Sequence, residues 1–148
     1  MVMSTYNIIT YKIENDIRVF GREVPTFPDG IKEAFTTLFE MIPDGRNRSY
    51  YDVSYMDDKG KIIYKVEAEE KYEDEAEKYN CERYIIEKGD YLAVTLENWR
   101  TQTGCIKDIF HEMMKDERAD MITPVVEWYK SDDEMLCLVK MKELKTVE

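Results

Sequence analysis

Apolar and polar residues follow two kinds of pattern along the chain, and each pattern predicts a type of secondary structure. Residues 4–13 and 17–24 are rich in β-branched and aromatic side chains, which is typical of strands. From 31 to 42 the apolar residues recur at helical spacing, which predicts an amphipathic helix. Two further strand-like runs, 49–56 and 61–70, are joined by a polar turn and predict a hairpin.

The second half of the chain repeats this order of elements. Residues 82–98 predict strand, turn and strand, 104–117 a helix, and 123–144 a second hairpin. The segment IKEAFTTLF at 31–39 aligns without a gap with IKDIFHEMM at 106–114, an offset of 106 − 31 = 75. At the same offset the turn pair Asp-Asp of the first hairpin maps onto Asp-Asp of the second. We interpret the pattern as an internal duplication of a strand-helix-strand-strand unit.

This duplication predicts an α+β fold with a pocket between two pseudo-twofold halves. The strands of both halves would join into one curved antiparallel sheet with the helices on its outer face. We expect one domain over residues 1–148, with halves at about 4–70 and 82–145 joined by an acidic linker at 71–81. The linker is dominated by charge and is expected to be solvated. A concavity should form on the face opposite the helices, because ligand sites favour the junctions between structural units.

The composition of the chain limits the classes of partner and site that we expect. The chain of 148 residues carries 32 acidic and 21 basic residues, a formal net charge of −11, which disfavours attraction to nucleic acids or anionic membranes. No apolar run reaches the length of a membrane span, and the first residues lack the basic start of a signal peptide, so we expect a cytoplasmic protein. Three dispersed cysteines and a single histidine predict neither a disulfide framework nor a metal site, and no cofactor motif is found.

One acidic residue stands within the densest apolar stretch, TPVVEWYK at 123–130. Alternation places Glu127 and Tyr129 on one face of this strand, and Val126 and Trp128 on the other. In the strand YLAVTL the aliphatic face is expected to pack on a helix, which leaves Tyr91 on the opposite face. By analogy, we expect Val126 and Trp128 to pack on a helix and Glu127 to face the concavity.

A carboxylate among tyrosines has two chemical uses. It can recognise an organic cation through charge and cation–π contacts, or it can act as a general acid or base with a pKa raised by burial. We expect Tyr64 also to point inward. The ordinary alternatives are a strand glutamate that is solvated or paired with a basic side chain, and tyrosines divided between core and surface. Aligning Tyr55 with Tyr129 places Val53 opposite Glu127, so that the acid would belong to one half only.

The order and spacing of KIIYKVEAEE, YIIEKGDYLAVTLENW and TPVVEWYKSD resemble the GyrI-like small-molecule-binding domain. This family includes DNA gyrase inhibitor proteins and the effector-binding domains of multidrug-sensing MerR-type and AraC-type regulators. The resemblance covers residues 5 to 143. It implies a tandem repeat with a pocket between the halves, in which the acid of a proline-x-x-acid-x-aromatic pattern meets the ligand. That acid corresponds to Glu127, with ligand-binding roles implied for Tyr64, Tyr91, Tyr129 and, at the rim, Trp99.

The resemblance therefore implies a stand-alone sensor or sequestering protein for hydrophobic, cationic or aromatic small molecules. Some relatives are hydrolases of strained cytotoxic compounds, in which case Glu127 would be catalytic. A third possibility is a module that binds a protein partner such as gyrase. Regulators of this family carry a helix-turn-helix region before the domain, and none precedes the first strand in this sequence, so direct DNA binding is not expected.

Overall fold

An eight-stranded antiparallel sheet organises residues 6–143, the part of the chain that this computed structural model describes. Three α-helices accompany it: α1 (Ile31–Met41), the short α2 (Glu75–Lys78) and α3 (Ile106–Met113). The strands are β1 (Ile9–Ile13), β2 (Ile17–Glu23), β3 (Tyr50–Met56), β4 (Ile62–Glu69), β5 (Glu82–Ile86), β6 (Gly89–Glu97), β7 (Val125–Tyr129) and β8 (Glu134–Lys140). The predicted α+β class is confirmed. The predicted residues 4–5 and 144–145 lie outside the described range.

The strand order reveals the relation between the halves. It runs β1-β6-β8-β7-β3-β4-β2-β5, so that each element of the first half has a counterpart at the mirrored position in the order. The strands β5 and β6 are adjacent in sequence but do not pair, because β5 joins β2 and β6 joins β1. Each half therefore supplies an edge strand to the other half, and β3 and β7 meet at the centre.

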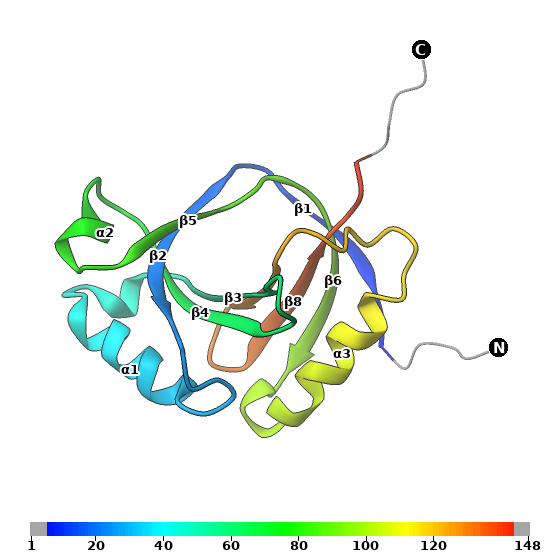
Figure 1. The fold of residues 1–148 in the computed structure, drawn as a ribbon, viewed down its shortest axis with the longest axis horizontal. Helices are drawn as coiled ribbons and strands as arrows, with labels where there is room; N and C mark the ends of the chain where they lie inside the picture. The colour runs from blue at the N-terminus through cyan, green and yellow to red at the C-terminus, as the bar shows by residue number, and fades with distance from the viewer. Residues whose placement is uncertain (1–5, 144–148) are drawn as a thin grey trace, which may run out of the picture.

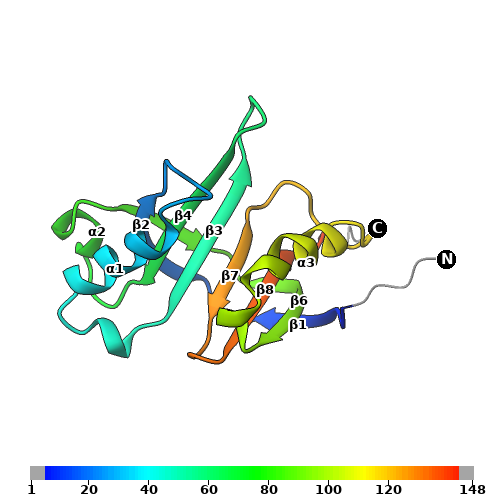
Figure 2. The ribbon, with the colours of Figure 1, turned by 90° about the horizontal axis from the view of Figure 1, so that it is seen from below.

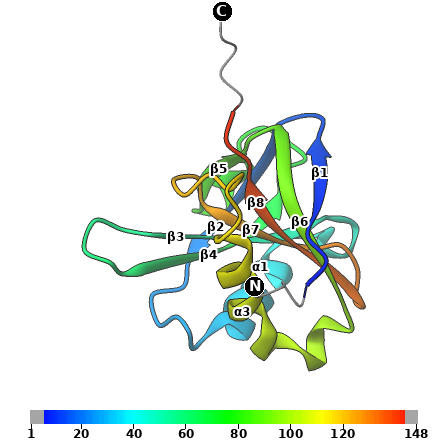
Figure 3. The same cartoon turned by 90° about the vertical axis from the view of Figure 1, so that its right-hand side faces the viewer.

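The sheet curls so that β1 and β5 approach one another at the top of Figure 1, and α1 and α3 cover its outer face. Seen from below, β3 and β7 run between the two helices (Figure 2). The distal end of the β3–β4 hairpin projects beyond the body of the molecule (Figure 3). Two apolar clusters pack under α1 and α3, and a third fills the concave face.

The face predicted to pack on a helix is confirmed for β6 and wrong for β7. Leu92, Val94 and Leu96 pack against α3, as predicted. The prediction that Val126 and Trp128 pack on a helix is wrong, because both belong to the cluster on the concave face. The analogy failed because the register pairs both Val126 and Ala93 with Leu138, so Val126 shares the concave face of Ala93. Glu127 consequently lies on the helical side of the sheet, between α1 and α3.

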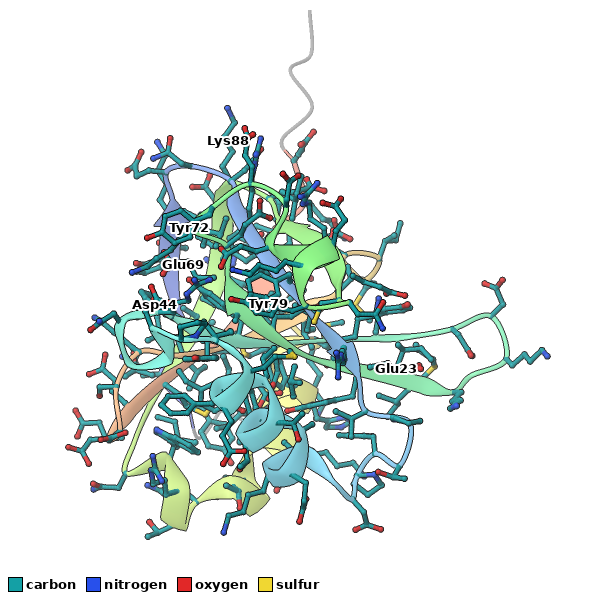
Figure 4. All side chains as sticks on the ribbon, turned by 90° about the vertical axis from the view of Figure 1, so that its left-hand side faces the viewer. Glu23, Asp44, Glu69, Tyr72, Tyr79 and Lys88 are labelled. Atoms are coloured by element: carbon teal, nitrogen blue, oxygen red, sulfur yellow. The ribbon has the colours of Figure 1, made fainter. Side chains whose placement is uncertain are left out.

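The acidic segment 71–81 is anchored to the protein and is not simply a solvated linker. Glu75 and Ala76 are buried, and the Glu75 carboxylate lies 2.6 Å from the buried guanidinium of Arg48. Arg48 also contacts Asp44 at 2.8 Å and donates to the backbone oxygen of Glu69. Asp44 and Glu69 lie on the same side of the molecule as Tyr72, whose ring Arg48 approaches (Figure 4).

Replacing Arg48 by alanine should destabilise the fold by about 3 kcal/mol, because it leaves the buried carboxylate of Glu75 without its cation. Urea denaturation measures the change in the free energy of unfolding. The control is Arg100→Ala, which breaks the exposed pair with Asp132 and should cost less than about 1 kcal/mol. Equal losses for the two variants would contradict the structural role assigned to Arg48.

Candidate functional site

Two carboxylic acids face each other across the central strand pair. Asp52 of β3 and Glu127 of β7 are direct partners in the antiparallel register. Their separation in sequence is 127 − 52 = 75, the same offset that relates the two helices. The acid pair therefore lies where the pseudo-twofold axis crosses the sheet. Both side chains are buried, with exposed fractions of 1% for Asp52 and 5% for Glu127.

Two tyrosine hydroxyls hold this acid pair. The Tyr129 hydroxyl donates to Asp52 at 2.5 Å and lies 3.1 Å from Glu127. The Tyr64 hydroxyl also contacts both acids, at 3.2 Å in the case of Glu127. The two tyrosine hydroxyls have two protons to donate, but they make four contacts with the acids. A protonated carboxyl that donates its O–H to a tyrosine oxygen completes the network. The second carboxyl oxygen of Asp52 is buried without a hydrogen-bond partner.

Burial dominates the electrostatics of the pair. It raises the pKa of Asp52 well above its ordinary value, and the neighbouring charge of Glu127 raises it further. Burial also raises the pKa of Glu127 to about 7, against the opposing effect of the hydrogen bond from Tyr129. Among the side chains that the structure describes, no arginine or lysine forms an ion pair with either acid. Burial therefore favours the protonated form of the pair, at a place where a buried structural acid would usually have a basic partner.

Aromatic rings close the site from the side of the helices. Phe27, in the loop before α1, stacks on Tyr64 with ring centroids 4.5 Å apart. Phe35 of α1 meets Tyr129 edge to face at 5.4 Å, and Trp99 meets the same ring at 4.9 Å. The indole of Trp99 is fixed by its hydrogen bond to the backbone oxygen of Ser131. Packed aromatic rings therefore cover the two acids on the helical side of the sheet.

The structure brings together most of the residues that the sequence suggested. Tyr64, Glu127 and Tyr129 are joined by hydrogen bonds, and Trp99 contacts Tyr129 at their edge. Tyr91 lies elsewhere: it belongs to the concave-face cluster, and its hydroxyl donates to the backbone oxygen of Glu87. It does not reach the acid pair, because alternation along β6 turns it away from the helices.

Sequence reasoning missed Asp52, although a signal was available. The alignment of Tyr55 with Tyr129 uses an offset of 74 and places a valine opposite Glu127. The offset of 75, given by the helices and turns, places Asp52 there instead. The inference that the acid belongs to one half only is therefore wrong. The two halves differ in their tyrosines. Tyr129 lies on β7, the same strand as Glu127, whereas Tyr64 lies on β4, the neighbour of the strand that carries Asp52.

Other classes of site find little support in residues 6–143. No group of three or more His, Cys, Asp or Glu side chains in this range is placed to hold a metal ion. No helix in the same range is long and apolar enough to cross a membrane.

The sequence matches no family model and no curated protein sequence. Several solved structures share the fold at low identity. The C-terminal domain of EcmrR has a TM-score of 0.62 at 14% identity, and the match covers 95% of this chain and 100% of that one. SAV2435 bound to tetraphenylphosphonium has a TM-score of 0.60 at 10% identity over 93% and 94%. A hydrolase from Listeria innocua has a TM-score of 0.61 at 10% identity over 93% and 92%. At such identities the likeness establishes a shared fold.

Proposed function

We propose that this protein binds hydrophobic organic cations at the acid pair formed by Asp52 and Glu127, as a sensor or sequestering protein. The observation that carries the proposal is the pair itself: two buried acids, held by tyrosines, that take part in none of the ion pairs formed by the described side chains. A bound cation would supply the missing positive charge in a setting of low dielectric. The rings of Tyr64, Tyr129 and Trp99 would add cation–π and apolar contact.

The structural neighbours support this reading. SAV2435 carries the lipophilic cation tetraphenylphosphonium on the same fold, and the resemblance to the GyrI-like domain implies the same ligand class. A ligand would have to displace the aromatic cover, since Phe27 and Phe35 pack against the tyrosines that hold the acids. The distinct possibility of a protein-binding module remains a prediction from sequence.

Binding of a cation should be coupled to release of a proton. Two charged carboxylates side by side would repel each other, so the empty site favours the protonated form. A positive ligand reverses this preference and favours ionisation. Proton-for-cation exchange keeps the buried site close to neutral in both states, which lowers the cost of burying the ligand's charge.

Replacing Glu127 by glutamine should weaken binding of tetraphenylphosphonium by roughly 30-fold, because about 2 kcal/mol of buried charge complementarity is lost. Asp52→Asn should have a comparable effect. Isothermal titration calorimetry of the full chain at pH 8 measures both affinities.

The matched control is Glu67→Gln. Glu67 is another buried acid on the same sheet, but its carboxyl lies toward Gly21, outside the acid pair. This variant should bind as tightly as the unmodified protein. Equal affinity of all the variants, or no binding by the unmodified protein, would rule out the proposed charge role.

The affinity for a permanently charged cation should rise with pH. Glu127 has a pKa of about 7, so the ionised form that the cation prefers increases between pH 6 and pH 8. We expect a gain of roughly tenfold over this interval, measured by calorimetry in buffers of different ionisation heat, which also reports the protons released. A flat profile with no proton release would contradict the exchange of proton for cation.

A second candidate function is acid–base hydrolysis of strained electrophiles. The observation in its favour is a carboxyl whose pKa lies near neutrality beside a second carboxyl, an arrangement suited to proton transfer. A fold neighbour described as a hydrolase is consistent with it. Glu127 would then protonate or deprotonate the reacting group.

Mass spectrometry of the protein incubated with a model aryl epoxide tests this candidate. Hydrolysis adds water across the strained carbon–oxygen bond and yields a diol. We expect Glu127→Gln to abolish diol formation if the protein is an enzyme, while Glu67→Gln retains it. If the unmodified protein forms the diol no faster than the Glu127→Gln variant does, hydrolysis is ruled out. Tight binding of the cation would then identify binding as the function.

A further inference from the structure

The concave face of the sheet contains a cavity that the acid pair does not use. It measures about 360 Å³ and is lined by residues of both halves together with the loop that joins β1 and β2. Val126, Leu138 and Ile86 contribute apolar surface. This volume falls within the range of pockets that hold small organic molecules, roughly 300–1,000 Å³.

Three aromatic rings line this cavity. The rings of Tyr51 and Trp128 are nearly parallel, with centroids 6.3 Å apart and an angle of 21° between their planes. Tyr11 meets Trp128 at 6.1 Å with a tilt of 60°. The indole nitrogen of Trp128 is buried and has no hydrogen-bond partner. An unsatisfied donor among apolar side chains is costly, and a water bound beside a ligand would remove the cost.

The charges around the cavity are mainly negative. Glu14, Asp16 and Glu69 line it, against Lys12 as the basic residue of the lining. Asp16 accepts a backbone N–H from Lys88, and Glu69 accepts one from Ser49. None of the ion pairs formed within residues 6–143 involves these three carboxylates. The potential in the cavity therefore favours a cation.

We infer that this cavity is a second ligand site, for a small aromatic ammonium compound. Its cationic head would lie among Tyr11, Tyr51 and Trp128, where ring faces attract an alkylated ammonium. Carboxylates at the rim supply the opposite charge. The ammonium of Lys130 lies 5.8 Å from the Trp128 ring centroid, so this indole already makes a cation–π contact within the protein.

The two sites share one strand but open on opposite faces of the sheet. Along β7, Glu127 and Tyr129 belong to the acid pair, whereas Val126 and Trp128 belong to the cavity. The chain contains two tryptophans, Trp99 beside the acid pair and Trp128 in the cavity. Each face therefore carries its own spectroscopic reporter.

The test uses these reporters in the full chain. Nuclear magnetic resonance resolves the two indole N–H signals, which Trp99→Phe and Trp128→Phe assign. Titration with trimethylphenylammonium should shift the Trp128 signal saturably, and the shift should persist in the double variant Asp52→Asn/Glu127→Gln. Tyr11→Ala should weaken this binding roughly fivefold, since one cation–π contact is lost.

Two controls make the test decisive. Tyr84→Ala removes a half-buried tyrosine of the same apolar cluster that does not line the cavity, and it should leave the affinity unchanged. The neutral analogue N,N-dimethylaniline should bind more weakly than the cation. The inference is overturned if the Trp128 signal does not shift, if the shift disappears with the acid pair, or if Tyr84→Ala weakens binding as much as Tyr11→Ala does. Equal binding of the neutral analogue would overturn the assignment of a cationic ligand.

Discussion

The burial of two carboxylic acids against each other, at the centre of the sheet, is the constraint around which this structure is arranged. Strands β3 and β7 can pair at their middle only if Asp52 and Glu127 are accommodated there. Two ionised carboxylates at this position would repel each other, and protonated carboxyls would still need hydrogen-bond partners. Tyr64 and Tyr129 provide those bonds from opposite halves. The interface between the halves is therefore polar at its core and apolar around it.

A buried acid alone does not mark a site, as a third carboxyl shows. Burial raises the pKa of Glu67 to about 8, and the nearby charge of Lys65 only partly opposes the shift. Its carboxyl fills the space beside Gly21, where any side chain would collide with it and with the carbonyl oxygen of Val66. Glu67 is thus enclosed by backbone. The acid pair differs because aromatic side chains, including Phe27 and Phe35, cover it.

The sequence predicted the elements well because their signals are local. Helical spacing at 31–42 and alternation in the two hairpins depend on neighbouring residues only, and α1, β3 and β4 formed where expected. The exchange of β1 and β5 between the halves depends on long-range pairing, which alternation does not encode. The predicted orientation of β7 is wrong for the same reason, because its pairing with β8 sets which face is concave. Both of its faces are buried, so polarity could not distinguish them.

The candidate site was predictable in part, and the reason is the duplication. Glu127 stood out as an acid among apolar residues, whereas Asp52 stands beside tyrosines and a serine and resembles an ordinary strand residue. Only the offset of 75 residues between the repeats shows that Asp52 and Glu127 are equivalent positions. A twofold relation places equivalent residues of β3 and β7 together at one point, the axis itself. Whatever residue type the ancestral unit had there would meet its own copy, and an acid at that position creates a paired acid site without further change. The tyrosines lie off the axis, and they come from non-equivalent strands of the two halves.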